Sequence, residues 1–514
     1  MKKIYLSFIV FISAKAMAQV PEDIIRYSWY PQNATARILG AGGVMGSVGG
    51  DLTAGFVNPA GIGFYHTNEA TLSPGFVMNT SKTAYRGTAM KDTKNGFAIG
   101  PSGVVIALPK NDSRNRSSAF AIAITQSNSF DNIIHYGGLN NYSSYSQQFA
   151  EEFSSLNKSI DDVLNSNSVA PYTAAPALYT YLIDTITIGG STIVKGAPEY
   201  VLDQGKALQQ DMLKTTKGGL YELNLAYAMN DGAKWLWGGS IGIPIINYES
   251  NSLFTETDTS SDHANHFSSF SYNDNFTTKG AGLNGRLGII YRPREYFRLG
   301  LAVHTPSYFM LTDSRETMMT TSLENPLFNA TVSSKMFANN QRGEAKYIQS
   351  SAWRAILSAS YVFREIEDVT KQRGFISADL EYVNYKGSKF SSNADQPTDD
   401  QTAYYKQLNG VIKNYYKGNI NFRLGGELKF NTIMVRAGMG YYGNPYSAAP
   451  SKANKMTLSG GLGYRNKGFF TDISYVYLMS NDFDVPYRLS GALNTYASIK
   501  QTRGNIAVTA GVKF

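Results

Sequence analysis

Four arginines in segments of alternating polarity are the clearest candidates for binding an anion. They are Arg286, Arg298, Arg354 and Arg423. A guanidinium holds a carboxylate through two parallel N–H donors, so one or two of them are candidate ligand contacts inside a lumen. The same segments also carry Asp379, Glu381, Glu427 and Asp472. Since buried charges of opposite sign usually pair, the alternative is a set of ion pairs that brace the protein.

Histidines offer little for catalysis or metal binding. A lipase-like site needs a serine, a histidine and an orienting polar residue on one wall. His304 is the best-placed histidine, and no serine can be assigned to it. His263 and His266 lie near Asp258 and Asp262, but regular structure that would fix metal geometry is missing there. We predict no enzyme activity, no metal and no cofactor.

The most unusual composition lies in residues 34–63, which read ATARILGAGGVMGSVGGDLTAGFVNPAGIG. Glycine permits unusual backbone angles and close backbone approach, and Asn58 before Pro59 is disfavoured in a helix. Gly40-x-Gly42 suggests a dinucleotide-binding loop, but the sixth position is Met45 and no strand precedes it. The residues of interest are Arg37, Gly40, Gly42, Gly43, Asp51, Asn58, Pro59 and Ala60.

The N-terminus has the features of a secretory signal peptide. Lys2 and Lys3 precede an apolar stretch of about ten residues, and Ala16-Met17-Ala18 forms an A-x-A cleavage site. The stretch is shorter than the ~20 residues of a membrane-spanning helix. We therefore predict a signal peptide over 1–18 and a mature chain that begins at Gln19.

Composition favours a membrane barrel over a soluble protein of several domains. The chain has 514 residues, 17% charged and 13% aromatic, with no cysteine and no dividing linker. Aromatic girdles and a polar lumen would give this profile. The formal charge of +8 becomes +5 without the three signal-peptide lysines (8 − 3). Basic residues are scattered, so we predict no nucleic-acid binding, and the excess positive charge suits anionic lipid headgroups.

After residue 68 the sequence alternates with a period of two, which predicts strands. Phe297, Leu299 and Leu301 would face lipid, while Arg298 and Gly300 would face a lumen. Fourteen strands are expected, the even number that bacterial barrels require. The expected ranges are 68–80, 95–107, 117–129, 218–229, 234–250, 268–291, 296–311, 340–363, 373–387, 419–429, 432–443, 454–465, 468–480 and 498–514.

Connection lengths separate a membrane barrel from a soluble β-sandwich. Short and long connections alternate along the expected strands, which is typical of short periplasmic turns and long extracellular loops. With both termini periplasmic, the expected extracellular loops include 81–94, 130–217 and 388–418. The fold class is therefore an all-β, 14-stranded antiparallel transmembrane barrel of the bacterial outer membrane, with 68–514 as the barrel.

The longest connection, 130–217, is too long for a plain hairpin loop. A first helix is predicted because Phe149, Phe153, Leu156, Ile160 and Leu164 recur at helical spacing, and a second is expected near 202–216. One interpretation is a cap that packs its apolar stripe on neighbouring loops. The other is an exposed patch that captures a ligand or binds another outer-membrane protein.

The C-terminus alternates Ile506, Val508, Ala510 and Val512 with small or polar residues and ends on Phe514. It is similar to the terminal strand that outer-membrane assembly machinery recognises. A final strand that closes the barrel against the first would show the same alternation.

Together, the residues of 34–63, the strand number, IGIPIINY (241–248) and LGIIYRPREYFRLGLAVHTP (287–306) resemble the outer-membrane transporter family for long-chain fatty acids and aromatic hydrocarbons. The resemblance implies an N-terminal hatch over 19–67, which ends in an Asn-Pro-Ala motif before the first strand. Arg37 and Asp51 are candidate anchors to lumen charges such as Glu427 or Arg423.

Members of that family release apolar ligands sideways through a gap caused by a kinked third strand. Strand 117–129 has no Gly or Pro, whereas strand 95–107 contains Gly100-Pro101-Ser102-Gly103. Proline removes a ladder donor and glycine marks bulges, so a lateral gate is expected at Gly100, Pro101 and Gly103. The alternative is a bulge that only shapes the barrel.

Two functions follow. The resemblance implies passive transport of hydrophobic compounds, fatty-acid-like or aromatic, past the hatch. The alternative is a non-transporting barrel that serves as a subunit of a larger outer-membrane secretion or assembly complex, which the length of 130–217 favours. The expected partners are the lipid bilayer, hydrophobic small molecules, the assembly machinery and other outer-membrane proteins bound through 130–217.

Overall fold

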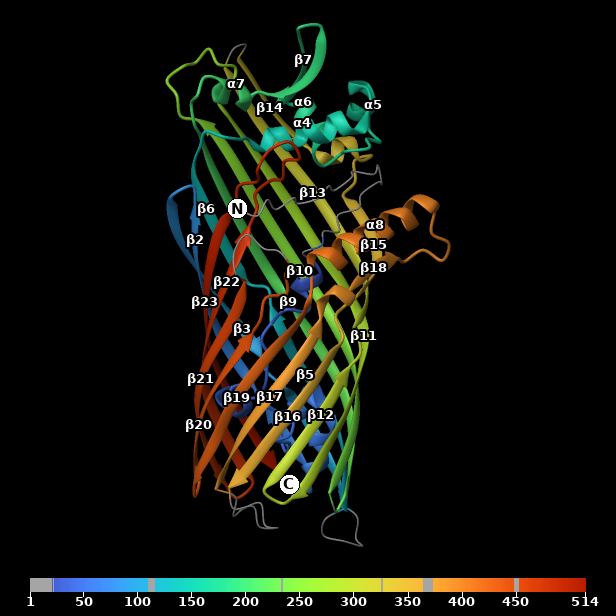
Figure 1. Ribbon diagram of the computed structural model, residues 1–514, viewed down its shortest axis with the longest axis vertical. Helices are drawn as coiled ribbons and strands as arrows, with labels where there is room; N and C mark the ends of the chain where they lie inside the picture. Colours follow the sequence, from blue (N-terminus) through green and yellow to red (C-terminus); the bar gives the residue numbers. More distant parts are fainter. Residues whose placement is uncertain are drawn as a thin grey trace.

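The computed structural model describes residues 21, 23–109, 116–232, 234–324, 327–363, 373–447 and 453–514. The predicted signal peptide and the expected start at Gln19 lie outside these residues. The chain forms a tall closed barrel with helices gathered at one end and the C-terminus at the other (Figure 1).

Fourteen antiparallel strands build the wall, several of them divided in two by an irregularity, which confirms the predicted fold class. In chain order they are β1 and β2 (Glu69–Leu72, Pro74–Tyr85), β3 and β4 (Thr88–Ile99, Ser102–Pro109), β5 and β6 (Arg116–Ser129, Asn132–Asn140), β9 (Leu208–Asp231), β10 (Trp235–Asp258), β11 (Ser269–Arg294), β12 and β13 (Phe297–His304, Tyr308–Glu324), β15 and β16 (Gly343–Ser350, Arg354–Phe363), β17 and β18 (Gly374–Asn384, Lys389–Ser392), β19 (Gly418–Phe430), β20 (Ile433–Tyr442), β21 (Asn454–Asn466), β22 (Phe469–Asp484) and β23 (Ala497–Lys513). The first span closes the barrel by pairing with the last, since β1 and β2 both pair with β23.

The strands are longer than the sequence predicted, and most of the extra length lies at the long-loop end. On β10 the outward side chains are apolar through Trp237, Ile241 and Ile245 and then become polar at Asn247 and Glu249. An apolar band of about 25 Å needs only the lower part of such a strand. The upper part of β10 therefore stands above the hydrocarbon.

Three expected boundaries are wrong because the strands extend further at the long-loop end than the sequence predicted. The expected loop 81–94 is a hairpin in which β2 continues into β3 through a turn at Arg86 and Gly87, both at positive φ. The third wall strand does not end with β5 but continues after a kink as β6, so the connection expected at 130–217 spans only 141–207. The helix expected near 202–216 is only α7 (Pro198–Asp203), because β9 begins at Leu208.

Helices and a small hairpin form a cap over the long-loop end, which we call the crown (141–207). It contains α4 (Tyr145–Leu156), α5 (Ile160–Leu164), α6 (Ala174–Tyr179), β7 (Ile183–Ile188), β8 (Ser191–Gly196) and α7. The remaining elements of this end are β14 (Leu327–Ser333), η2 (Ser334–Phe337), η4 (Tyr385–Gly387) and α8 (Asp399–Tyr415). No helix in the described part of the chain has the length and hydropathy that crossing a membrane requires.

The lumen is filled by the N-terminal residues 23–64. They contain α1 (Asp23–Arg26), α2 (Ala36–Gly40), α3 (Ala54–Val57) and η1 (Pro59–Phe64). Residues 34–64, called the plug below, pack in the lower half, where the blue coils of Figure 1 lie inside the barrel. Residues 23–33, called the strap, place Ile24, Tyr27 and Trp29 among aromatic side chains of the upper wall.

Candidate functional site

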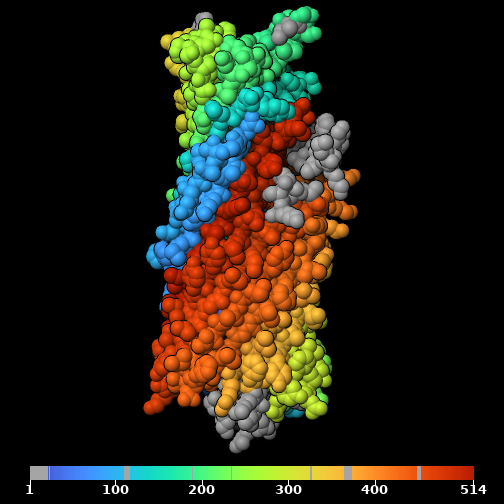
Figure 2. Space-filling model, turned by 60° about the vertical axis from the view of Figure 1, so that its left-hand side comes forward, coloured from blue at the N-terminus to red at the C-terminus, as the bar shows by residue number. Residues whose placement is uncertain are grey.

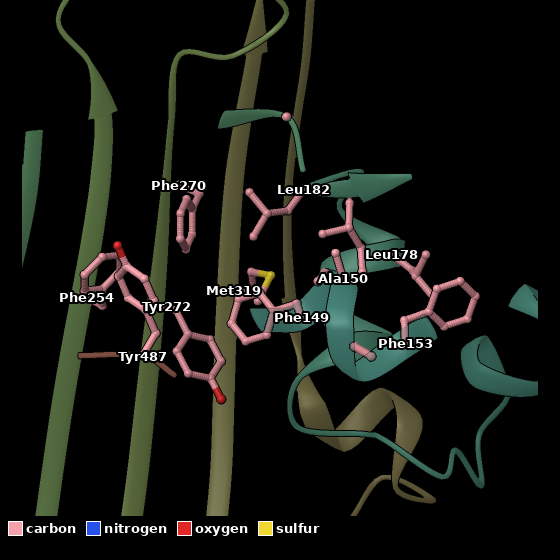
Figure 3. Close-up of a cluster of buried hydrophobic side chains, with 14 of the residues drawn as sticks. Phe149, Ala150, Phe153, Leu178, Leu182, Phe254, Phe270, Tyr272, Met319 and Tyr487 are labelled. Atoms are coloured by element: carbon pink, nitrogen blue, oxygen red, sulfur yellow. The ribbon is translucent and has the colours of Figure 1, made fainter. Parts of the chain in front are cut away.

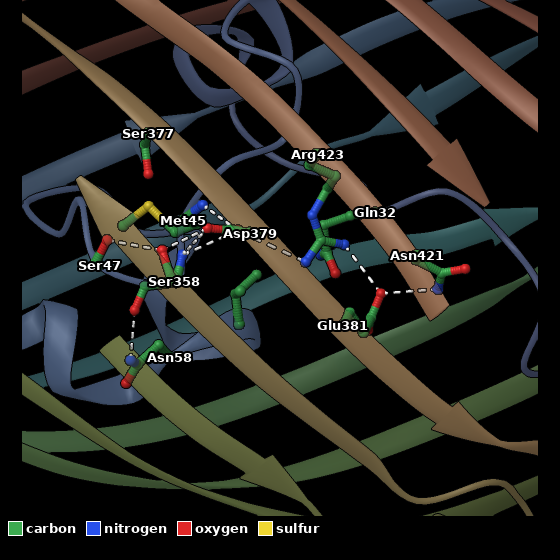
Figure 4. Close-up of polar contacts among 12 residues, drawn as sticks. Gln32, Met45, Ser47, Asn58, Ser358, Ser377, Asp379, Glu381, Asn421 and Arg423 are labelled. Atoms are coloured by element: carbon green, nitrogen blue, oxygen red, sulfur yellow. Dashed lines mark hydrogen bonds and ion pairs between the residues drawn. The ribbon is translucent and has the colours of Figure 1, made fainter. Parts of the chain in front are cut away.

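Wall side chains hold the plug through its backbone. Asp379 on β17 accepts hydrogen bonds from the backbone N–H of Met45 at 2.9 Å and of Gly46 at 3.1 Å (Figure 4). The hydroxyl of Ser358 donates to the same carboxylate at 2.6 Å. These hydrogen bonds go to main-chain atoms and so require no polar side chain in the plug. The residues between its glycines can therefore be almost wholly apolar.

The Asn-Pro-Ala motif is a second point of attachment. The Asn58 side-chain amide donates to the carbonyl of Gly46 at 2.6 Å and to that of Ile289 on β11 at 3.3 Å. Its oxygen accepts from the N–H of Ala60 at 3.2 Å, which starts the turn of η1 at Pro59. Asn58 therefore joins two plug segments to each other and to the wall.

Glycines of the wall let the plug approach. A Cβ at Gly300 would lie 2.0 Å from the Gly46 carbonyl oxygen, and one at Gly425 would lie 2.0 Å from that of Ala41. Plug glycines contribute in turn, since a Cβ at Gly42 would lie 2.6 Å from the Leu424 carbonyl oxygen. Gly42 and Gly43 also have φ of +76° and +78°, a region that side chains disfavour.

The expected anchor Arg37 pairs with Glu427 at 3.1 Å, as predicted. Asp51 was expected to pair with a lumen charge and does not. It accepts hydrogen bonds from the Thr35 hydroxyl and the Thr53 backbone N–H, and so stays within the plug. Six glycines between residues 40 and 50 leave the plug few side chains of its own that could hold it, which would predict a loosely held segment; the wall side chains described above hold it through its backbone instead.

The four candidate ligand arginines contact protein groups. Arg286 pairs with Glu222 at 2.5 Å, and Arg298 donates to the Val48 carbonyl at 2.6 Å. Arg354 donates to the Ser28 carbonyl of the strap at 2.7 Å. Arg423 contacts Glu381 at 3.1 Å and Asp379 at 3.6 Å, as Figure 4 shows. These contacts match the alternative interpretation, in which charges brace wall, strap and plug.

The barrel wall is discontinuous where Gly100–Gly103 divides β3 from β4. Below this stretch β4 pairs with β1 and β5. Above it, among the residues that the structure describes, β3 pairs with β2 alone. The third wall strand is irregular at the same height. It has a register shift between Gln126 and Asn128 and is broken between β5 and β6. Sequence reasoning missed this kink because no Gly or Pro marks it.

Instead of a ladder, β6 lies against the inner face of the β2–β3 hairpin; we call this overlap the seam. Asn79 donates to the Asp131 carbonyl at 2.6 Å, and the Ser81 hydroxyl donates to Asn132 at 3.1 Å. An ion pair adds to these contacts, with Lys94 3.7 Å from Asp131, and the ring of His135 lies 3.7 Å from the Asp92 carboxylate. All of these contacts involve side chains, so the wall closes here without backbone pairing.

The strap reaches the lower end of the seam. Asn33 donates to the carbonyl of Ile99, the last residue of β3, at 3.1 Å and to that of Gln126 on β5 at 2.7 Å. One amide thus bridges both edges of the discontinuity. Gly100 fits against the first residue of the plug, because a Cβ there would lie 2.7 Å from the Ala34 carbonyl oxygen.

A small cavity of about 70 Å³ lies behind the seam. Its polar lining includes Arg503, which donates to Asn79 at 2.7 Å, and Asn505, whose side-chain oxygen has no hydrogen-bond partner among the described residues. Apolar lining comes from Leu39, Val77, Ala98, Val476 and Leu478. A cavity of about 150 Å³ is known to hold benzene, so this space is too small for a hydrocarbon unless the seam widens.

The crown closes the long-loop end with an apolar core. Phe149 and Phe153 of α4 are both buried; Phe149 packs edge-to-face on Tyr272, while Phe153 points away from the strands (Figure 3). Leu156, Ile160 and Leu164 pack against the same cluster. The apolar stripe is therefore the packing face of a cap, the first of the two interpretations.

Two acids are buried at this core, Glu152 and Glu256, and burial raises the pKa of Glu256 on β10 to about 7. Glu152 of α4 accepts a hydrogen bond from the Thr173 hydroxyl at 2.7 Å, while its second oxygen has no partner in the described part of the chain. Burial raises the pKa of Glu152 to about 7. The carboxyl is thus mostly protonated below neutral pH.

The histidines form neither of the sites considered. His304 donates to the Val57 carbonyl of the plug at 2.7 Å. His263 lies 3.2 Å from Glu324, while Asp258 contacts Ser260. In the described residues, no group of three metal-ligating side chains is present.

These features define a bacterial outer-membrane β-barrel with an occupied lumen. No family model matches the chain, and no curated protein matches it. A FadL homologue from Pseudomonas aeruginosa aligns with a TM-score of 0.51 and 12% identity, over 98% of this chain and 100% of that chain. The toluene transporter TodX from P. putida aligns with a TM-score of 0.51 and 13% identity, over 94% and 99%. The chain has the fold of these proteins, as the resemblance in its sequence predicted.

Proposed function

We propose that the protein is a passive outer-membrane channel for hydrophobic compounds, fatty-acid-like or aromatic, with its lateral gate at Gly100, Pro101 and Gly103. The observation that supports this proposal is the wall discontinuity with a part-apolar cavity behind it. If stability were the sole requirement, β3 would pair along its whole length with the third wall strand, which consists of β5 and β6. Each ladder hydrogen bond that is missing lowers the stability of the barrel. The similar barrels described as a toluene transporter and a FadL homologue point to the same class of cargo.

Opening requires the exchange of side-chain contacts for water. Each hydrogen bond of the seam contributes roughly 1 kcal/mol net, and exposed ion pairs contribute less. Moving β6 and the β2–β3 hairpin apart breaks a few such contacts and leaves the β2–β23 and β6–β9 ladders intact. An apolar ligand then passes directly between the cavity and the bilayer.

The plug acts in this proposal as the hatch that separates the cavity from the periplasm. Leu39 of α2 lines the cavity, and the chain between the strap and α2 carries Asn33 across the discontinuity. Displacement of the strap would break the Asn33 hydrogen bonds that join β3 to β5, and would enlarge the cavity at the same time. The buried attachment of Met45, Gly46 and Asn58 makes the lower plug the more fixed part.

A disulfide across the seam tests the gate, and the absence of natural cysteine makes the result unambiguous. Ser81→Cys with Asn132→Cys should oxidise readily, since the native side chains touch at 3.1 Å. Uptake of radiolabelled toluene and of a long-chain fatty acid should fall at least about tenfold and recover on reduction.

Thr80→Cys with Thr93→Cys is the matched control, because these hydroxyls lie 3.3 Å apart on two strands that stay paired. That disulfide should leave uptake unchanged. Full uptake through the oxidised seam would exclude the gate. The substitution Gly103→Thr is unsuitable as a test, because a Cβ at Gly103 would lie 2.1 Å from the Ile122 carbonyl oxygen.

The crown favours the second candidate, a non-transporting subunit of a secretion or assembly complex. Its apolar core covers the long-loop end of the lumen, a feature that lateral transport does not require. Mild solubilisation and copurification separate the two functions. A stoichiometric protein partner that is lost on deletion of 183–196 supports the subunit, and a lone barrel carrying lipid supports the channel.

A further inference from the structure

Three lysines form a lateral row on the outward face of the wall near the seam. Lys82 on β2 lies directly opposite Lys500 on β23 and Lys91 on β3. All three side chains are exposed, and within the described part of the chain none forms an ion pair. Like charges placed directly opposite each other destabilise a sheet, so this row costs stability unless an anion binds it.

Other exposed lysines of the upper wall have different neighbours. Lys217 lies opposite Glu249, Lys279 lies opposite Asn247, and Lys346 lies opposite Thr312. Each of these positions has a neutral or acidic residue directly opposite it on the neighbouring strand. The row of three is thus a local feature of β23, β2 and β3.

The rows beneath the lysines place them relative to the membrane. Two residues down each strand lies a row of hydroxyls, Thr502, Thr80 and Thr93. Six residues down β2, about 20 Å along the strand, Phe76 packs edge-to-face on the exposed Phe97. The outer face therefore changes from aromatic to hydroxyl to ammonium, which places the lysines at the lipid headgroups.

The surface view agrees with this placement. In Figure 2 the blue β2–β3 hairpin lies on the outside of the barrel beside the red strands β22 and β23, directly below the crown. The row is thus open to a ligand that approaches within the outer leaflet.

We propose that Lys82, Lys91 and Lys500 form a binding site for a phosphate monoester of an outer-leaflet glycolipid. Neighbouring strands are about 4.8 Å apart, and flexible lysine stems let three ammonium groups converge on one phosphate. A phosphate monoester carries about 1.5 to 2 negative charges and three acceptor oxygens, which match three donors better than a carboxylate does. The acyl chains of the same lipid would lie on Phe76 and Phe97.

The site extends the function of the hairpin, since β2 and β3 also form the outer leaf of the seam. A lipid bound to Lys82, Lys91 and Lys500 fastens β23, β2 and β3 together on their outer side. It does so without touching the seam contacts of Asn79 and Ser81, which lie on the opposite face. The binding proposal stands on the row alone and does not depend on transport.

Native mass spectrometry of the full-length protein in detergent tests the site. The probes are a glucosamine-based lipid with two phosphates, the same lipid after dephosphorylation, and phosphatidylglycerol. A lysine at an anionic surface contributes about fivefold, so Lys82→Gln with Lys91→Gln and Lys500→Gln should weaken binding of the phosphorylated lipid roughly 100-fold. The matched control is Lys217→Gln with Lys279→Gln and Lys346→Gln. It should change the affinity for the phosphorylated lipid less than about threefold.

Three outcomes would overturn the proposal. They are equal weakening by both triple variants, equal affinity for the dephosphorylated lipid, and equal affinity for phosphatidylglycerol, a phosphodiester. Each variant is first checked for the heat-modifiable band of a folded barrel. If the triple variant does not fold, Lys82→Gln alone removes the central charge and should weaken binding about fivefold.

Discussion

The attachment of the plug at Asp379 predicts how readily the lower lumen opens. Asp379→Ala removes the acceptor of two buried backbone N–H groups, those of Met45 and Gly46. A buried donor without a partner costs about 1–3 kcal/mol, so the plug should lose roughly 3 kcal/mol of docking free energy. Arg423 keeps Glu381 at 3.1 Å, so the wall retains its own ion pair and the loss falls on the plug.

A cysteine in the plug reports this change. Val44 is fully buried, and the chain has no other cysteine, so Val44→Cys can be labelled by a hydrophilic maleimide only when the plug moves. A loss of about 3 kcal/mol should raise the labelling rate roughly 100-fold, because each 1.4 kcal/mol is a factor of ten. Asp379→Asn keeps one acceptor oxygen and should raise the labelling rate about tenfold.

The reasoning is refuted if Asp379→Ala labels at the rate of the parent protein in a folded barrel. It is also refuted if labelling and loss of the heat-modifiable band occur together, since the whole barrel would then have opened. A pronounced increase without a change in that band would show that the plug moves as a unit on a fixed wall.

Three further predictions concern the crown and the lumen. The raised pKa of Glu152 means that its stabilising contribution is present below pH 4.5 and is lost as pH rises through about 7, up to about 3 kcal/mol ((7 − 4.5) × 1.36). Protease should therefore cut the crown faster at pH 8.5 than at pH 5. Glu152→Gln should reduce that difference, and the remainder should come from Glu256, which binds Ser144 and Tyr145 of the crown and whose pKa burial also raises to about 7. Protease added to intact cells should cut within 141–207 and spare the turn between β9 and β10; cutting only in spheroplasts would invert the topology. Deletion of residues 34–57 should leave a folded barrel with raised permeability to small probes if the plug blocks the lumen, and unaltered permeability would exclude that role.

The barrel itself was predictable because lipid and lumen impose opposite demands on alternate residues. Phe297, Leu299 and Leu301 had to be apolar, so the period of two appeared directly in the sequence. The family resemblance implied a kink in the third wall strand (β5 and β6), but its own residues gave no sign of it, since the kink lies near Phe130, which is buried against Tyr27 of the strap. Such a contact joins residues about a hundred positions apart and leaves no local signal.

The attachment of the plug had a partial signal. Gly300 was expected to face the lumen, and both Gly300 and Gly425 lie where plug carbonyls approach the wall. The partners of Asp379 and Asn58, however, are main-chain atoms, which every residue carries. Side-chain identity cannot reveal which backbone group a carboxylate or an amide will bind, so the sequence suggested a loosely held plug.

The contrast between plug and seam locates the part of the molecule that can move. The plug is held by buried hydrogen bonds, including charge-assisted bonds to Asp379, which are among the strongest in proteins. The seam is held by side chains such as Ser81 and Lys94 near the outer boundary of the hydrocarbon, where water can replace each contact. Opening between β3 and β6 therefore requires less free energy than expulsion of the plug. In the proposed function, an apolar ligand would therefore pass through the side of the barrel while the axial path stays filled.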